Sequence, residues 1–231
     1  MGSCMLVCGP HTSGKTVFIL QLIDAAREMF DIPPTKVFWY YGQRTALHEQ
    51  LKSRNFNMIQ GIPPNFDFVT PNSLVMLDDL MVEGGNNANV TNLFIKGAHH
   101  VLCFVICRSQ NIFPKGVENR NRQLNTQYLV LFKNTRDVRQ IQYLENQMYP
   151  HSKHFLVKAY QDATAKPYTY LFLDSHQLTP ATARVRARIL PSQRPMTVFV
   201  DKRLFGGVTT SKSLKQPRIE RPEQLQNWSF G

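Results

Sequence analysis

The stretch CMLVCGPHTSGKTVFILQL, residues 4–22, decides the fold. Within it, GPHTSGKT at residues 9–16 matches the pattern G-x-x-x-x-G-K-[ST]. A short apolar run precedes the pattern, and apolar residues recur at helical spacing over residues 15–29. The order strand, glycine-rich loop and helix is the context in which this pattern forms a phosphate-binding loop.

The residue types of this loop suit the phosphates of a nucleotide. Glycines let backbone N–H groups face phosphate oxygens, and the N-terminus of the next helix adds positive potential. We expect Lys15 to reach the β- and γ-phosphates as a catalytic group, and Thr16 to ligate Mg²⁺. The expected ATP-binding residues are Gly9, Pro10, His11, Thr12, Ser13, Gly14, Lys15, Thr16 and Val17. A purely structural glycine-rich turn is the alternative.

Acidic and amide side chains follow two other predicted strands. Asp78 ends the apolar run SLVML, at the edge where open α/β sheets bind ligands. We predict that Asp78 holds Mg²⁺ and that Asp79 orients or deprotonates the attacking water. The apolar run at residues 101–107 is followed by Gln110 and Asn111, and an amide there could sense the γ-phosphate. The start of a solvated loop is the alternative at each place.

Apolar strand candidates alternate with helical stretches along the whole chain. This alternation predicts one α/β domain with a mostly parallel sheet, flanked by helices and buried on both faces. Further strands are expected at residues 36–41, 56–61, 73–78, 101–107, 127–132 and 168–174, and helices at 45–53, 88–97, 135–148 and 151–163. The domain spans residues 1–204, and a basic, flexible tail follows at 205–231.

Composition narrows the class of protein. Of the 231 residues 42% are hydrophobic and 19% charged, a globular balance, and we expect no membrane span. The net charge of +11 is uneven, with ten Lys or Arg against three acids from Arg184 onward, so that segment either grips a polyanion or is simply solvated. Cysteines 4, 8, 103 and 107 do not form a metal site, because residues four apart on a strand lie about 13 Å from each other, too far to ligate one ion. They are expected to be small buried strand residues.

A series of motifs resembles a known family. GPHTSGKT, VFWYYGQ, IQGIP, SLVMLDDLM, NLFIKGAHH, SQNIFPKG, YLVLFKNTRD and KPYTYLFLD keep the order found in DNA-packaging ATPases of the FtsK-HerA superfamily. Within it they resemble the branch of adintoviruses, Polinton (Maverick) elements and, more distantly, poxviruses. The resemblance covers residues 4–188 and implies a P-loop NTPase fold of the additional-strand type, with sheet order 5-1-4-3-2. It places residues 101–107 between the two motif strands and makes Gln110 the sensor amide.

The same resemblance implies a shared catalytic site. Rings of this kind complete each site with a basic finger from the neighbouring subunit, because transition-state charge needs a cation. The candidates are Lys96, where relatives often carry Arg, and Arg120 and Arg136; a surface charge or a DNA contact is the alternative for each. Candidates for sequence-independent DNA contact are Lys115, Arg120 and Arg122. The wider superfamily usually has Glu at the position of Asp79, and His99 and His100 match paired histidines with an expected packing role.

The expected function is ATP hydrolysis coupled to translocation of double-stranded DNA, with ATP and Mg²⁺ as cofactors. The expected assembly is a homo-oligomeric ring, hexameric or pentameric, with capsid or portal proteins as further partners and no membrane. Its expected location is the host cell interior, nucleus or cytoplasm, with transient association with the virion. Two alternatives are a nucleotide-gated DNA-binding protein with little turnover and a P-loop phosphotransferase.

Overall fold

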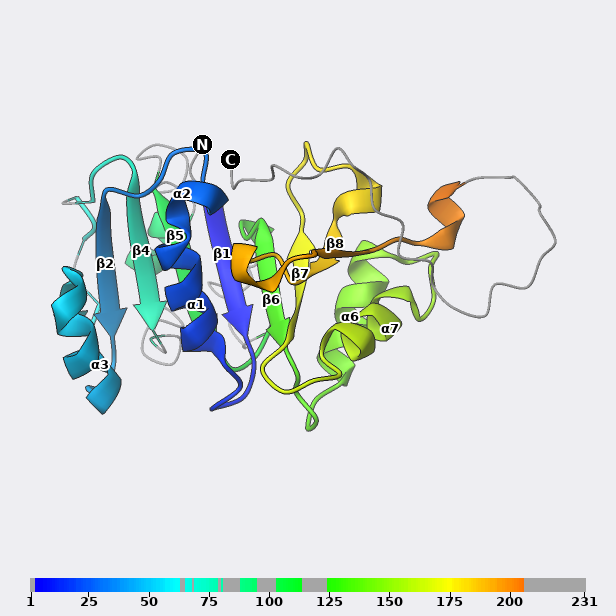
Figure 1. The fold of residues 1–231 in the computed structure, drawn as a ribbon, viewed down its shortest axis with the longest axis horizontal. Helices are drawn as coiled ribbons and strands as arrows, with labels where there is room; N and C mark the ends of the chain where they lie inside the picture. Colours follow the sequence, from blue (N-terminus) through cyan, green and yellow to red (C-terminus); the bar gives the residue numbers. More distant parts are fainter. Residues whose placement is uncertain are drawn as a thin grey trace.

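A computed structural model describes residues 3–62, 65–67, 69–78, 80, 88–94, 103–113 and 124–205. The described strands form a single nine-stranded sheet of order β3-β2-β4-β5-β1-β6-β7-β8-β9 (Figure 1). Their bounds are β1 Ser3–Cys8, β2 Lys36–Tyr41, β3 Asn57–Gln60, β4 Ser73–Asp78, β5 Phe104–Ser109, β6 Tyr128–Phe132, β7 Tyr170–Asp174, β8 Val185–Ala187 and β9 Thr197–Phe199. The fold is therefore mixed α/β with a large sheet, as expected.

Six strands, β3 to β6 in the sheet order, run parallel. β5 lies between β4 and β1, which places residues 104–109 between the two motif strands as expected. The five-strand order 5-1-4-3-2 is not the order of the whole sheet: it is contained there as β6-β1-β5-β4-β2, with β3 added at one end and β7 to β9 at the other.

The added strands β7, β8 and β9 are antiparallel to their neighbours. β7 lies within the strand predicted at residues 168–174, whereas β8 and β9 have no counterpart in the prediction, since three residues are too few to reveal an alternating pattern. They extend the sheet away from the loop at residues 9–16. The loop at residues 9–16 therefore lies at the edge formed by the carboxyl ends of the parallel strands.

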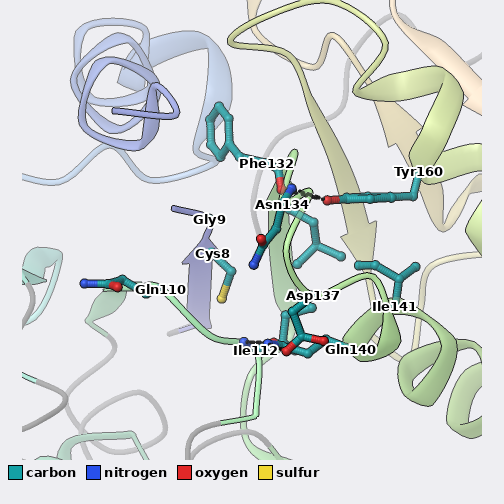
Figure 2. A pocket seen from close by; sticks show the side chains of 11 residues that line it. Cys8, Gly9, Gln110, Ile112, Phe132, Asn134, Asp137, Gln140, Ile141 and Tyr160 are labelled. Atoms are coloured by element: carbon teal, nitrogen blue, oxygen red, sulfur yellow. Dashed lines mark hydrogen bonds between the residues drawn. The ribbon is translucent and has the colours of Figure 1, made fainter. Parts of the chain in front are cut away.

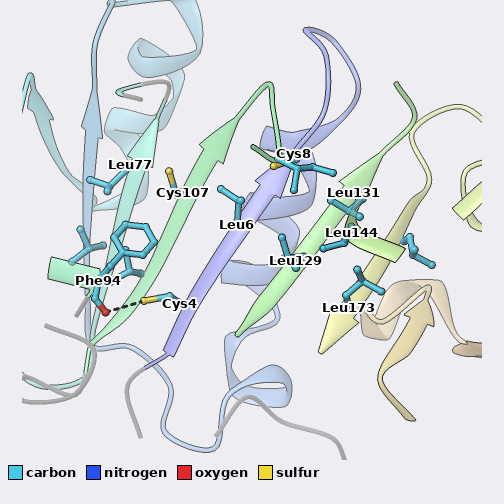
Figure 3. Packing of buried hydrophobic residues seen from close by; sticks show 14 of the residues in the cluster. Cys4, Leu6, Cys8, Leu77, Phe94, Cys107, Leu129, Leu131, Leu144 and Leu173 are labelled. Carbon is cyan, nitrogen blue, oxygen red and sulfur yellow. Dashed lines mark hydrogen bonds between the residues drawn. The ribbon is translucent and has the colours of Figure 1, made fainter. Parts of the chain in front are cut away.

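Helices cover both faces of the sheet because side chains alternate along each strand. Met5 and Val7 of β1 point to the face covered by α1 (Lys15–Asp24), where Phe18, Ile19 and Leu22 are buried. Figure 3 shows Cys4, Leu6 and Cys8 on the opposite face, where they share a core with Leu129, Leu131 and Leu144. That second face is covered by α6 (Arg139–Met148) and α7 (Phe155–Ala163).

The predicted helices exist, with shorter bounds. The stretch 15–29 divides at Ala25 into α1 and α2 (Ala26–Met29), and 45–53 contains α3 (Ala46–Leu51) and the 3₁₀ turn Lys52–Arg54. α4 spans Ala88–Asn92, and residues 95–97 of that prediction lie outside the described part of the chain. Short 3₁₀ turns also occur at Ala181–Ala183, Pro191–Gln193 and Lys202–Phe205. Over the described residues, no helix has the length and hydrophobicity needed to cross a membrane.

Candidate nucleotide-binding site

The loop at residues 9–16 connects the end of β1 to the start of α1. Gly14 has φ of 103°, a left-handed conformation that favours glycine, and it precedes the first residue of α1. Gly9 is closely packed: a Cβ there would lie 2.7 Å from Cβ of Phe132. Phe132 ends β6, the neighbour of β1. The two glycines are thus required by the path of the loop and by its contact with the sheet.

Lys15 is buried at the start of α1 and reaches back over the loop. Its Nζ donates to the carbonyl oxygens of Gly9 and Pro10, at 2.6 Å each. Only 6% of the residue is exposed. The loop therefore curls around the ammonium group, whose three donors can exchange a carbonyl for a phosphate oxygen.

Asp78 ends β4 and is held by several polar groups. The residue is 3% exposed. Its Oδ2 accepts a hydrogen bond from Nε1 of Trp39 at 3.2 Å, and Nε2 of His48 lies 3.6 Å from the same oxygen. Its Oδ1 lies 2.5 Å from Nε of Arg108, the residue paired with it on the adjacent strand β5. The carboxylate is thus fixed at both oxygens.

Thr16 and Asp78 are brought together through Arg108. Nη1 of Arg108 donates to Oγ1 of Thr16 at 2.8 Å while its Nε contacts Asp78. A hydroxyl and a carboxylate are the oxygen ligands that Mg²⁺ takes at nucleotide sites, alongside phosphates and waters. Among the described residues, no group of three or more His, Cys, Asp or Glu could hold a metal alone. The donor set therefore fits Mg²⁺ carried by a nucleotide and not a protein-only metal site.

Gln110 lies at the mouth of a pocket beside the loop. The pocket is lined by Cys8, Gly9, Gln110, Ile112, Leu131, Phe132, Asn134, Asp137, Gln140, Ile141 and Tyr160 (Figure 2). Nε2 of Gln110 lies 2.9 Å from Nε2 of His11, a residue of the loop. The structure thus places the predicted sensor amide next to the predicted phosphate-binding loop.

The polar wall of this pocket is fixed by hydrogen bonds. Oε1 of Gln140 accepts from the backbone N–H of Ile112 at 2.7 Å, and Nε2 of Gln140 donates to Asp137 at 2.6 Å. The hydroxyl of Tyr160 donates to the carbonyl of Phe132 at 3.0 Å and accepts from the N–H of Asn134 at 2.7 Å. Helices α6 and α7 therefore tie the segments after β5 and β6 together.

Other predicted site residues fall partly outside the described chain. Asp79, Lys96, Lys115, Arg120 and Arg122 lie there, as do His99 and His100. Arg136 is described: it is exposed in the segment after β6, and its N–H donates to Oδ1 of Asn134. The site as described therefore joins the loop, Asp78 and Gln110.

Four residues near the site are not predicted by the sequence pattern. Arg108 follows an apolar run, where a polar residue indicates only the start of a loop. Trp39 and His48 give no signal, because their partner Asp78 is distant in sequence. Tyr168 is 72% exposed, has φ of 62°, and would contact a Cβ on Gly14 at 3.4 Å. Its position at the start of a predicted strand is the one signal that the sequence offers.

The four cysteines are buried and form no disulfide, as predicted. Burial raises the pKa of the Cys103 thiol to about 11 and raises the pKa values of Cys4 and Cys8 well above their usual range. Sγ of Cys8 donates to the carbonyl of Asn111 at 3.5 Å. These thiols belong to the core and contribute no nucleophile to the site.

Comparison with known proteins gives little guidance on function. No protein-family model matches the chain, and no curated protein matches it. Among solved structures, it is similar to the genome packaging NTPase B204 from Sulfolobus turreted icosahedral virus 2 in complex with ATP-gammaS. The identity is 13%, the match covers 86% of this chain and 96% of that one, and the TM-score is 0.43. Likeness at this level indicates no shared function, so the function of this chain has to be inferred from the geometry of the site itself.

Proposed function

We propose that the chain is an ATPase that couples ATP hydrolysis to translocation of double-stranded DNA, in the packaging of a viral genome into a capsid. One observation carries the nucleotide part: β1 leads into the glycine loop with Lys15 and Thr16, β4 ends in Asp78, and Arg108 of the intervening strand β5 contacts both Thr16 and Asp78 at the carboxyl ends of these parallel strands. This edge is where open α/β sheets bind ligands. A structural turn would not require both a buried lysine in the loop and a buried aspartate at the end of β4.

Each residue has a defined task in this proposal. Lys15 transfers its donors from the carbonyls of Gly9 and Pro10 to the β- and γ-phosphates. Thr16 and Asp78 would hold Mg²⁺, which neutralises phosphate charge and orients the γ-phosphate for attack. Asp78 stays in place because Trp39 anchors its second oxygen.

The attacking water and the base of the nucleotide need further groups. Asp79 follows Asp78 directly and is the proposed general base. Gln110, beside His11 of the loop, is the proposed γ-phosphate sensor. Tyr168 presents an exposed aromatic ring next to Gly14, and we propose that it stacks on the adenine.

The motor part of the proposal is supported by the order of sequence motifs and by charge. A net charge of +11 favours binding of a polyanion, and Lys115, Arg120 and Arg122 are the proposed contacts to the DNA backbone. A homo-oligomeric ring would supply the finger from the next subunit, with Lys96, Arg120 and Arg136 as candidates. Capsid or portal proteins are the proposed further partners, and the proposed location is the interior of the host cell.

The test is the ATPase rate of the purified protein with and without double-stranded DNA, beside a mass measurement of the assembly. We expect DNA to raise the rate and Lys15→Ala to abolish it. Lys153→Ala, which removes an exposed lysine away from the loop, is the matched control and should behave like the wild type. A purified ring whose rate of ATP hydrolysis does not change when DNA is added would refute the coupling of hydrolysis to translocation.

Two other outcomes would indicate the alternative functions. Binding of ATP and DNA without turnover above background would indicate a nucleotide-gated DNA-binding protein. A phosphorylated product formed without net ATP hydrolysis would indicate a phosphotransferase. The ATPase measurement and a product screen separate the three functions.

A further inference from the structure

Arg108 bridges the two residues proposed to hold Mg²⁺. Its Nε lies 2.5 Å from Oδ1 of Asp78, and its Nη1 donates to Oγ1 of Thr16 at 2.8 Å. Both nitrogens belong to one planar guanidinium, whose fork geometry allows it to engage two oxygens at once. One cation of the chain therefore contacts both of these proposed metal ligands.

The sheet register explains this position. Arg108 is paired with Asp78 on β4 and with Val7 on β1. Its side chain therefore lies between β4, which ends in Asp78, and β1, which leads into the loop. Its side chain is 20% exposed, whereas that of Asp78 is 3% exposed. The guanidinium thus has an open side toward which it can move, and the carboxylate does not.

Simultaneous binding of Mg²⁺ and this guanidinium to Oγ1 of Thr16 and Oδ1 of Asp78 is unfavourable. A magnesium ion binds its ligands at about 2.0–2.1 Å. A guanidinium still bonded to the same oxygens would lie only about 4 Å from the ion, where like charges repel by several kcal/mol at an intermediate dielectric. The two cations are therefore alternative partners of Thr16 and Asp78.

Asp78 is built to remain in place when one cation replaces the other. Its Oδ2 keeps the hydrogen bond from Trp39 whichever cation contacts Oδ1. Nδ1 of His48 accepts the backbone N–H of Thr45 at 2.9 Å, which leaves the neutral ring's proton on Nε2, 3.6 Å from Oδ2. The carboxylate is thus positioned through its Oδ2 by Trp39 and His48, independently of Arg108.

We infer that Arg108 is a tethered cation that takes the place of Mg²⁺ between Thr16 and Asp78 and yields it when the metal arrives with a nucleotide. Arg108 is in this sense a positioning residue: it keeps the two ligands aligned and charge-balanced until they bind the metal. It also sets how strongly nucleotide binding depends on Mg²⁺. The inference rests on the proposed nucleotide site.

The test compares the affinity of ADP in Mg²⁺ and in EDTA by isothermal titration calorimetry. Arg108→Gln removes the competitor of Mg²⁺ and also the cation that offsets Asp78 when metal is absent. The affinity for ADP should rise in Mg²⁺ and fall in EDTA. The dissociation constant in EDTA divided by that in Mg²⁺ should therefore increase by about tenfold or more. Arg54→Gln, which breaks the exposed pair with Asp24, is the control and should leave the ratio unchanged.

Two results would overturn the inference. An equal loss of affinity in Mg²⁺ and EDTA would mean that Arg108 binds phosphate directly, and a smaller ratio would mean that it supports the metal. If Arg108→Gln does not fold, Arg108→Lys serves instead: a single ammonium group cannot reach both oxygens, and the ratio should increase by a smaller factor. If the wild type does not bind ADP, or if Lys15→Ala does not affect ADP binding, the nucleotide site itself is rejected. These outcomes differ from the two results that would overturn the inference about Arg108.

Discussion

An Asp78→Asn variant exchanges one carboxylate oxygen for an NH₂ group and keeps the shape of the side chain. In the structure both oxygens face donors, Nε of Arg108 at Oδ1 and Nε1 of Trp39 at Oδ2. An asparagine therefore points its NH₂ group at a donor in either orientation of the amide. The variant loses one charge-assisted hydrogen bond and gains a donor–donor conflict, whichever way it turns.

The magnitude of the effect can be worked from these contacts. A buried hydrogen bond to a charged group contributes about 1.5–3 kcal/mol. Breaking a fully buried ion pair costs about 3–5 kcal/mol, and the 20% exposure of the Arg108 side chain reduces that figure. We expect a loss of about 3 kcal/mol in the free energy of unfolding, or roughly 6–12 °C in Tm for a chain of this size.

The assay is urea unfolding followed by far-ultraviolet circular dichroism, run as a double-mutant cycle with Trp39→Phe. Phenylalanine has no donor, so the asparagine can turn its NH₂ group toward it and its oxygen toward Arg108. The double variant should lose about 1–2 kcal/mol less than the sum of the single losses. Asp24→Asn, in an exposed pair, should cost under about 1 kcal/mol.

Two results would refute this reasoning about Asp78. One is a loss in the Asp78→Asn variant no larger than that in Asp24→Asn. The other is additivity of the Asp78→Asn and Trp39→Phe losses within about 0.5 kcal/mol.

Three further predictions concern single positions. Tyr168→Gly should raise the free energy of unfolding by about 1 kcal/mol because it relieves the strain of the positive φ, yet it should weaken ATP binding about tenfold because the stacking is lost. Tyr168→Phe keeps the ring and should bind ATP like the wild type. An unchanged affinity of Tyr168→Gly for ATP, measured by calorimetry, would exclude the contact with the base. Burial raises the pKa of Cys103 from 9.0 to about 11, so this thiol ionises first in the unfolded chain, and Cys103 should contribute a fall in stability of up to ~1.4 kcal/mol per pH unit between those values. A urea series across this range checks the slope, which Cys103→Ala should reduce. Gly9→Ala should abolish ADP binding because its methyl group would lie 2.7 Å from Cβ of Phe132. Gly61→Ala is the control: its methyl group would meet no atom within 4 Å, the backbone strain would cost only about 1–2 kcal/mol, and the variant should bind ADP normally.

The parts of the site that the sequence predicts are those encoded locally. The loop, its glycines and Lys15 form a contiguous pattern between a strand and a helix, and the structure has that arrangement. Asp78 lies at the end of its strand as predicted, because a polar residue after an apolar run has few other positions. Local spacing is sufficient for such features.

The contacts that surround Asp78 could not be predicted in the same way. Arg108 and Thr16 are 92 residues apart, and Trp39 and Asp78 are 39 apart, so their contacts depend on the order and register of strands. Hydrophobic periodicity specifies which residues are buried but not which strand lies next to which. The resemblance to known packaging ATPases implies the core order, and it does not extend to the side chains that hold the carboxylate or to β8 and β9.

The hydrogen bond between Trp39 and Asp78 has a practical consequence. The chain contains two tryptophans, Trp39 and Trp228, so a Trp228→Phe variant emits from a single indole. That indole is fully buried and touches the carboxylate at which guanidinium and metal are proposed to exchange. Indole emission responds to nearby charge, and the protein therefore carries an optical reporter of the proposed metal site, readable by stopped-flow fluorescence without any added label.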